Sequence, residues 1–232
     1  MKQPVDLVVF DIAGTTVEDS GEIAIAFQEA LRAFGYNIPV EKINPLMGYK
    51  KKEAIKRLVR EYEIKKEKIS PEYIEKIHQL FLERMMDFYS TTEQLKPLPF
   101  AEEVFASLKE RNIVIGLDTG FPKEITNIII HRLGWIKDYK VDYVISSNEV
   151  IAGRPFPYMI EEIMLKAKLK DPKKVIKVGD TEVDINEGKN AGCLYSIGIT
   201  SGAFTKEDLA EYKPSFILND LKELITIIDN IQ

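Results

Sequence analysis

The sequence predicts an α/β protein in which helices cover a parallel β-sheet. The prediction rests on short, nearly continuous apolar segments and on the amphipathic stretches that separate them. The first segment, Val5–Phe10, is rich in valine, as expected of a strand buried on both faces. The other expected strands are Ile113–Leu117, Tyr143–Ile145, Val175–Val178 and Tyr195–Ile197.

Amphipathic stretches between and after these strands predict the helices of the core. They are Ala101–Arg111, Pro122–Leu133, Phe156–Lys168, Thr181–Asn190 and a closing helix around Leu221–Ile228. The segment from about Gly21 to Tyr89 breaks the alternation, because it has only helical periodicity. We therefore expect a core made of residues 1–16 and 97–232, and a helical cap with its linkers at 17–96.

The second half of the expected cap has the clearest helix signal. Ser70-Pro71-Glu72 combines a capping residue, a first-turn proline and an acidic first turn. A single apolar stripe follows at Ile74, Ile77, Phe81, Met85 and Phe88. The return to the core through 95–99 contains Pro97 and Pro99, which predicts an extended linker.

Composition limits the class of protein. The chain has 232 residues, of which 45% are hydrophobic and 30% charged, and a net charge of -5. This acidic balance gives no basic field for nucleic acid. Cys193 is the only cysteine, and the sequence has neither a signal-peptide pattern nor an apolar run of about twenty residues. We expect a cytoplasmic protein with no membrane partner.

Polar residues follow several of the predicted strands at the point where each strand ends. Asp11 follows the first strand, Asp118-Thr119-Gly120 the second, and Gly179-Asp180 the fourth. Arg154 precedes the helix after the third strand. Open parallel sheets bind ligands at the carboxyl ends of their strands. The sequence therefore predicts one site at this edge.

The residue types at that edge fit phosphoryl transfer. A carboxylate, here Asp11, can attack phosphorus and form an aspartyl phosphate. Attack by one anion on another needs a cation between them. Mg²⁺ prefers oxygen ligands such as the carboxylates of Asp11 and Asp180, and Asp184 would adjust its coordination shell. The transferred group needs hydrogen-bond donors and a fixed cation. We expect these from Thr119, Gly120 and Arg154.

Each of these residues also has an ordinary structural explanation. An aspartate after a strand often forms a turn, and the spacing of Thr181 and Asp184 is that of a capping box. Arg154 could lie on the surface, and Thr119 could belong to a turn. Their convergence at one edge of one sheet favours the functional interpretation.

These segments, in this order and spacing, resemble the haloacid dehalogenase-like superfamily over essentially the whole chain. The resemblance implies a Rossmann-like, doubly wound core with a helical cap after the first strand. It also implies that Asp11 is the nucleophile and a metal ligand, and that Thr119 and Arg154 bind phosphate. Asp180, Asp184 and the backbone carbonyl of Ala13 would complete a Mg²⁺ site.

Ala13 restricts the type of reaction that the resemblance implies, because ordinary phosphatases of this superfamily have an acidic residue two positions after the nucleophile. Asp11-Ile12-Ala13-Gly14-Thr15-Thr16 is similar to the phosphonoacetaldehyde hydrolase branch. The segments Met47-Gly48, 152–155 and 177–181 match as well. In that branch a cap lysine forms an imine with the aldehyde, so that the C–P bond breaks while phosphorus moves to the aspartate. Lys51 matches that position, and Met47, Gly48 and Gly120 would contact the substrate.

A physical argument also singles out Lys51. Lys50-Lys51-Lys52 lies where a helix begins, so that neighbouring ammonium groups and the helix dipole should favour a neutral amine. The alternative is a solvated basic run.

Three positions depart from the branch, which has a cysteine, a histidine and a tyrosine where this chain has Gly21, Ala54 and Phe121. A phosphatase acting on a small phosphate monoester such as phosphoglycolate or a sugar phosphate is therefore the alternative. A phosphate-accepting receiver module is a further rival, although such modules are shorter and lack the helical insertion. The apolar cap helices also allow a homodimer, which light scattering would test.

Overall fold

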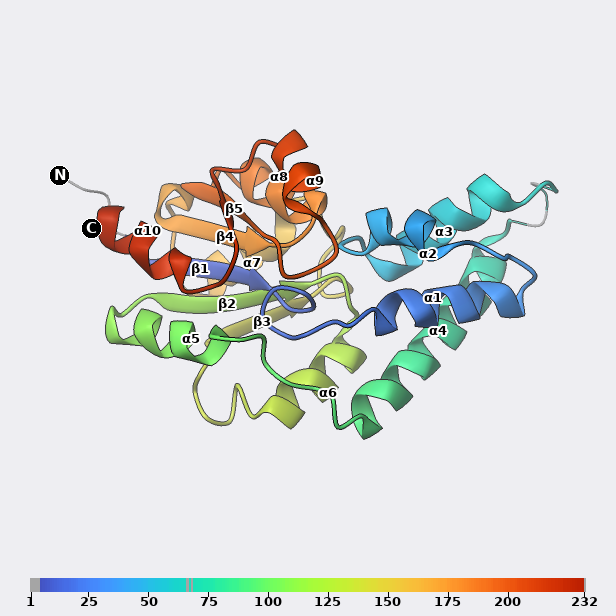
Figure 1. Ribbon diagram of the computed structural model, residues 1–232, viewed down its shortest axis with the longest axis horizontal. Coiled ribbons are helices and arrows are strands. Elements are labelled where there is room, and N and C mark those ends of the chain that lie inside the picture. Colours follow the sequence, from blue (N-terminus) through green and yellow to red (C-terminus); the bar gives the residue numbers. More distant parts are fainter. Residues whose placement is uncertain (1–4, 66, 68, 232) are drawn as a thin grey trace.

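The computed structural model describes residues 5–65, 67 and 69–231. These residues form a six-stranded parallel sheet with the order β3-β2-β1-β4-β5-β6 (Figure 1). From β1 in the interior the chain moves outward on one side through β2 and β3, and on the other through β4, β5 and β6. The strands are β1 (Leu7–Asp11), β2 (Val114–Thr119), β3 (Tyr143–Ser146), β4 (Val175–Gly179), β5 (Tyr195–Ile199) and β6 (Phe216–Leu218). The predicted doubly wound fold is confirmed.

Helices cover both faces of this sheet because β1 alternates its side chains between two apolar clusters. Val8 and Phe10 belong to the larger cluster, and Leu7 and Val9 belong to the cluster under α7. The core helices are α5 (Ala101–Glu110), α6 (Lys123–Leu133), α7 (Tyr158–Lys166), α8 (Glu182–Asn190), α9 (Lys206–Glu211) and α10 (Glu223–Ile231), with a 3-10 turn η3 at Pro172–Lys174.

Two features of the sheet differ from the prediction. The edge strand β6 was not predicted, because its apolar run of three residues is too short to be distinguished from a loop, and only Leu218 of the three is buried. Strand β2 also continues past Leu117 to Thr119. Asp118 and Thr119 are therefore the last residues of a buried strand, which fixes their backbones more firmly than a loop would.

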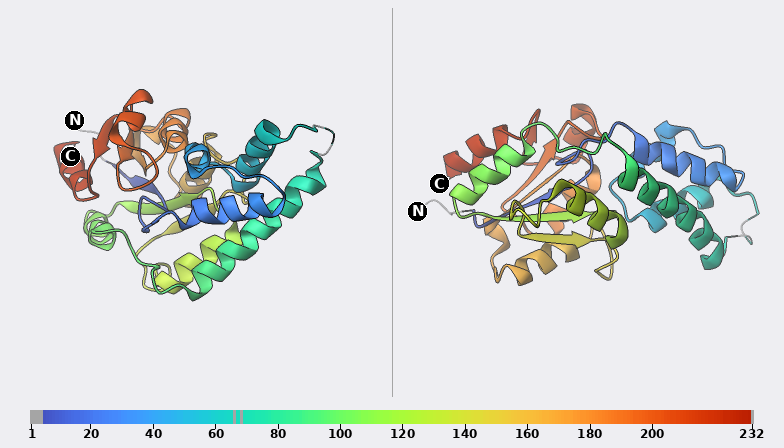
Figure 2. Two further views of the ribbon diagram at one scale, coloured as in Figure 1. Left: turned by 45° about the vertical axis from the view of Figure 1, so that its right-hand side comes forward. Right: turned by 90° about the horizontal axis from the view of Figure 1, so that it is seen from below.

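A second group of helices lies beyond the carboxyl ends of the strands (Figures 1 and 2). It consists of α1 (Glu22–Ala33), α2 (Val40–Ile43), the 3-10 turn η1 (Asn44–Leu46), α3 (Lys51–Tyr62) and α4 (Pro71–Thr91). Helix α4 begins as predicted, with the Ser70 hydroxyl accepting from the Tyr73 N–H at 3.1 Å. Its buried stripe ends on Tyr89 rather than on Phe88, which is only partly buried.

The two chain crossings between the helical group and the sheet lie side by side. Val17 pairs with Pro97, and the Leu98 N–H donates to the Thr16 carbonyl at 2.8 Å. Arg132 of α6 donates to the carbonyls of Tyr89 and Thr92 at 2.7 and 2.8 Å, at the end of α4. The division at 17–96 stays a prediction, and we use "cap" for these residues. Within the described residues, no helix combines the length and apolarity that crossing a bilayer requires.

Candidate active site

Most of the predicted site residues lie around one cavity between the cap and the sheet. Asp11, Thr119 and Asp180 reach it from the ends of β1, β2 and β4, and Arg154 comes from the segment between β3 and α7. The cap contributes Lys51, the first residue of α3. Ala13, Met47, Gly48 and Gly120 complete the predicted residues in the wall. The space open to water is about 20 Å³, room for little more than one molecule, so the cap is closed over the site.

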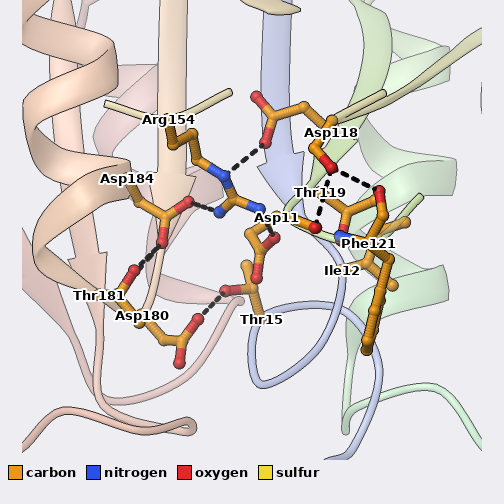
Figure 3. A network of polar contacts seen from close by, with 12 residues as sticks. Asp11, Ile12, Thr15, Asp118, Thr119, Phe121, Arg154, Asp180, Thr181 and Asp184 are labelled. Carbon is orange, nitrogen blue, oxygen red and sulfur yellow. Dashed lines mark hydrogen bonds and ion pairs between the residues drawn. The ribbon is translucent and has the colours of Figure 1, made fainter. Parts of the chain in front are cut away.

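Arg154 organises the carboxylates at this edge of the sheet (Figure 3). Its Nη2 is 2.6 Å from Asp11 Oδ1, its Nη1 donates to Asp184 Oδ1, and its Nε is 3.9 Å from Asp118 Oδ1. The guanidinium is buried, so these ion pairs are shielded from water. The alternative that Arg154 is a surface residue is therefore wrong.

Asp184 is held by the protein at both oxygens. Its Oδ2 accepts from the Thr181 hydroxyl and N–H at 2.5 and 3.2 Å, while its Oδ1 faces Arg154. Burial alone would raise the pKa of Asp184, but Arg154 and Lys177 hold it below its ordinary value. Asp184 thus has the capping geometry that its spacing predicted and also lies beside the site.

In contrast to Asp184, the carboxyl groups of Asp11 and Asp180 have pKa values above the ordinary value of an aspartate. Burial, with a smaller contribution from the Asp184 carboxylate, raises the pKa of Asp11 to about 6 although Arg154 opposes the rise. Burial and repulsion from Asp11 raise the pKa of Asp180 well above its ordinary value. Asp180 is fixed by Thr15 Oγ1 at 3.1 Å and by the Ala203 N–H at 2.7 Å.

These carboxylates fit a hard cation. Oxygen atoms of Asp11, Asp180 and Asp184 lie within 4.8 Å of one another, and all three side chains are buried. Burial and, to a smaller extent, repulsion among them raise the pKa values of Asp11 and Asp180, and a divalent cation would offset that repulsion. An all-oxygen donor set suits Mg²⁺.

A second buried cluster shares Asp118 and Asp184 with Arg154, and its importance was not predicted from the sequence. Lys177 of β4 donates to Asp118 and lies 3.3 Å from Asp184 Oδ1 and 3.1 Å from Glu187 Oε2. Burial disfavours its ammonium, but these carboxylates raise its pKa. The signal in the sequence was a lysine inside a strand buried on both faces, which requires acidic partners. This cluster fixes the carboxylates that hold Arg154.

Lys51 is buried in the cavity wall, so the alternative of a solvated basic run is wrong for this residue. Its ammonium lies over the rings of Phe121 and Phe27, 5.0 and 5.7 Å from their centroids, and donates to the Met47 carbonyl. Burial and the Arg154 charge lower the pKa of Lys51 to about 8. The opposing carboxylates are Asp11, Asp19 and Asp180.

The direction of this shift agrees with the prediction, but the predicted cause does not dominate. Repulsion from Lys50 and Lys52 was expected to favour the neutral amine. Both of these lysines are partly exposed, and Lys52 pairs with Glu75, so water and a counter-charge weaken their effect. Removal of the Lys51 amine from water is the larger effect.

Cap and core meet closely around two glycines. A Cβ on Gly48 would lie 2.2 Å from Thr181 Oγ1 and 2.3 Å from Val183 Cγ2, and one on Gly120 would lie 2.6 Å from the Tyr49 carbonyl oxygen. The Tyr49 hydroxyl donates to Glu182 Oε1 of α8 at 2.6 Å. Only glycine allows this approach of the cap.

Gly48→Ala should therefore hinder closure of the cap. The added methyl group would push the cap, and Lys51 with it, away from the sheet. We expect kcat/KM to fall by about 10²-fold, because Lys51 and Asp11 would then no longer be correctly placed about one substrate. Thermal unfolding should change little, since the clash exists only between cap and core. A Gly48→Ala enzyme with unchanged kcat/KM would contradict this account of closure.

The three positions that depart from the pattern of the phosphonoacetaldehyde hydrolase branch hold no side chain that could carry a proton. Gly21 is the N-cap residue before α1, with φ 102°, Ala54 is fully buried on α3, and Phe121 packs against Lys51. Asp19 also lines the cavity, although nothing in the sequence distinguished it from an ordinary linker acid.

Comparisons with known proteins agree with this geometry. The sequence profile of the haloacid dehalogenase-like hydrolases matches residues 5–192. The chain belongs to this family of hydrolases. It is 31% identical to phosphonoacetaldehyde hydrolase of Bacillus mycoides over 244 aligned residues, covering 97% of this chain and 87% of that protein. It is 33% identical to the enzyme of the same name from Latilactobacillus sakei, covering 82% of this chain and 74% of that protein.

Solved structures share the fold of this hydrolase. A phosphonoacetaldehyde hydrolase-like protein from Oleispira antarctica superposes with a TM-score of 0.86 at 22% identity, covering 99% of this chain and 93% of that one. A predicted phosphoglycolate phosphatase from Haemophilus somnus gives 0.78 at 20% identity, covering 96% and 97%. At these identities the likeness concerns the fold, so the choice between substrates depends on the cavity.

Proposed function

We propose that this hydrolase cleaves the C–P bond of phosphonoacetaldehyde or a related aldehyde phosphonate through an imine on Lys51. The observation that carries the proposal is a buried lysine of lowered pKa in the same cavity as the Asp11 carboxylate. A phosphate monoesterase needs no such amine, and Ala13 cannot supply the acid that an alkoxide leaving group requires. The names of the curated relatives point in the same direction.

Each residue then has a defined role. The neutral Lys51 amine attacks the carbonyl carbon, and loss of water gives a protonated imine. Asp11 attacks phosphorus, the C–P bond breaks, and its electron pair moves toward the imine nitrogen to give an enamine. Water hydrolyses the aspartyl phosphate to inorganic phosphate. Protonation of the enamine carbon and hydrolysis of the imine release the aldehyde and restore Lys51.

The remaining residues position the phosphoryl group. Thr119 and the backbone at Gly120 offer donors at the end of β2, and Arg154 offers a fixed positive charge. Met47 and Gly48 line the aldehyde side of the cavity, beside Lys51. Mg²⁺ held by Asp11, Asp180 and the Ala13 carbonyl, with Asp184 alongside, would neutralise charge between the phosphoryl group and Asp11.

A substrate panel tests this function. We expect phosphate release from phosphonoacetaldehyde, with acetaldehyde formed in equal amount, and much slower release from phosphoglycolate and sugar phosphates. The reverse order would support the phosphate monoesterase, because that reaction requires no aldehyde in the substrate.

Activity on phosphonoacetaldehyde should rise with pH through about 8. The pKa of Lys51 is lowered to about 8, so below this pH the amine is protonated and cannot attack the carbonyl. Above it the neutral form predominates, so further loss of protons from Lys51 no longer raises kcat/KM. Hydrolysis of p-nitrophenyl phosphate, whose leaving group requires no imine, should not show this rise of kcat/KM with pH. The same rise with both substrates would argue against Lys51 as its origin.

Chelation of divalent metal should abolish turnover of both substrates. The closely spaced Asp11, Asp180 and Asp184 carboxylates then repel an incoming phosphoryl anion. We expect EDTA to reduce the rate below detection and added Mg²⁺ to restore it. Full activity after exhaustive chelation would contradict the proposed metal site.

A further inference from the structure

Asp19 is a cavity carboxyl group that the roles described above leave unused. It lies in the linker between β1 and α1, and its side chain lines the same cavity as Asp11, Lys51 and Phe121. Its Oδ1 accepts from the Gly21 N–H at 2.9 Å, which orients the carboxyl group. Lys51 and Asp19 influence each other electrostatically, although the described residues include no direct ion pair between them. Both residues therefore border the cavity that an aldehyde would enter.

The imine steps need a proton carrier beside the Lys51 nitrogen. Gly21, Ala54 and Phe121 cannot transfer protons, and Asp11 and Asp180 are committed to phosphorus and metal. Glu22, the next acidic residue, does not line the cavity, and its Oε2 accepts from the Ser20 N–H at 2.9 Å. Among the residues that the structure describes, Asp19 is the remaining acid in the cavity wall.

We propose that Asp19 is the general acid–base of the imine steps, carrying protons between the Lys51 nitrogen and the oxygen of an aldehyde phosphonate. The proposal rests on the proposed function. As Lys51 attacks, the N–C bond forms and the Asp19 carboxyl group gives its proton to the carbonyl oxygen. The resulting carboxylate takes a proton from the Lys51 nitrogen and delivers it to the hydroxyl group. The C–O bond then breaks, water leaves, and the nitrogen lone pair completes the protonated imine.

The surroundings of Asp19 favour this use. Burial raises the pKa of Asp19 above its ordinary value, and Glu22 adds to the rise, while the Gly21 N–H and Lys51 oppose it. A larger fraction of Asp19 is therefore protonated near neutral pH than of an exposed aspartate. After imine hydrolysis, which reverses these steps, the proton returns to Asp19 and the group is ready for the next turnover.

The alternative is that Asp19 only shapes the turn before α1. Asp19→Asn separates the two roles, because the amide oxygen can still accept from the Gly21 N–H but the group cannot donate an acidic proton. Glu22→Gln is the matched control, since it removes the same charge three residues away, outside the cavity wall. Asp19→Ala with added formate provides a second test, because a small acid can occupy the place of the missing carboxyl group.

The experiment measures the rate at which phosphonoacetaldehyde forms an imine that borohydride traps, together with p-nitrophenyl phosphate hydrolysis. For Asp19→Asn we expect imine formation to slow by about 10²–10⁴-fold, with a far smaller effect on the phosphate ester. Formate should restore part of the rate to Asp19→Ala. Glu22→Gln, which keeps the Asp19 carboxyl group and removes only a smaller contribution to its pKa, should retain most of the rate.

Three other results would overturn the proposal. An Asp19→Asn enzyme that forms the imine at the normal rate would refute the role of Asp19 and leave the proposed function standing. Equal loss of both activities, without rescue by formate, would assign Asp19 to the fold of the linker. Failure of the unmodified enzyme to form an imine would refute the proposed function, and the role of Asp19 with it.

Discussion

Replacement of Asp11 by asparagine is expected to reduce turnover of every substrate by at least about 10⁴-fold, because the amide cannot attack phosphorus. The protein should still fold. The amide oxygen can accept from Arg154, whose Nη2 lies 2.6 Å from Asp11 Oδ1, and burial already disfavours a charge at this position. Phosphate release from phosphonoacetaldehyde and p-nitrophenyl phosphate measures the loss, and thermal unfolding measures the fold.

Asp6→Asn is the matched control for this variant. Asp6 immediately precedes the other end of the same strand, where it pairs with Lys174 at 3.0 Å. A surface pair of this kind contributes little to stability, and we expect normal activity. Loss of activity in both variants, or retained turnover in Asp11→Asn, would remove Asp11 from its proposed role.

Lys51→Met should produce a selective loss. Methionine keeps an unbranched apolar chain between Phe27 and Phe121 but has no amine. We expect turnover of phosphonoacetaldehyde to fall by at least about 10³-fold, since neither the imine nor its electron-withdrawing charge can form. Hydrolysis of p-nitrophenyl phosphate should fall far less, because Asp11, Arg154 and Asp180 remain in place.

The neighbouring Lys52 offers the control. It lies one residue further along α3, pairs with Glu75, and does not line the cavity. Lys52→Met should retain turnover of phosphonoacetaldehyde. If Lys51→Met loses both activities equally, Lys51 supports the fold of the closed site rather than the imine.

The arrangement of the core could be predicted from the sequence because its signals are local. Near-continuous valine-rich segments marked β1 and β4, and polar residues directly after them marked the carboxyl edge of the sheet. The edge strand β6 was missed, since it has three residues and little burial. Its pairing depends on β5 rather than on its own pattern.

The site was less predictable, because its electrostatics depend on contacts between distant residues. The sequence pointed to Asp11, Arg154 and Asp180 by position, yet the contact of Arg154 with three carboxylates appears only in the fold. Lys177 carried a visible signal that was not used. Asp19 carried none, because its place in the cavity wall depends on how the linker and the cap pack over the sheet.

Identification of the lysine that borohydride traps tests the central claim most directly. The enzyme is treated with phosphonoacetaldehyde and borohydride, and its peptides are then analysed by mass spectrometry. The account predicts one modified residue, Lys51, with loss of activity in proportion to the label and no label in Lys51→Met. Steady release of phosphate and acetaldehyde with no label on Lys51 would contradict it.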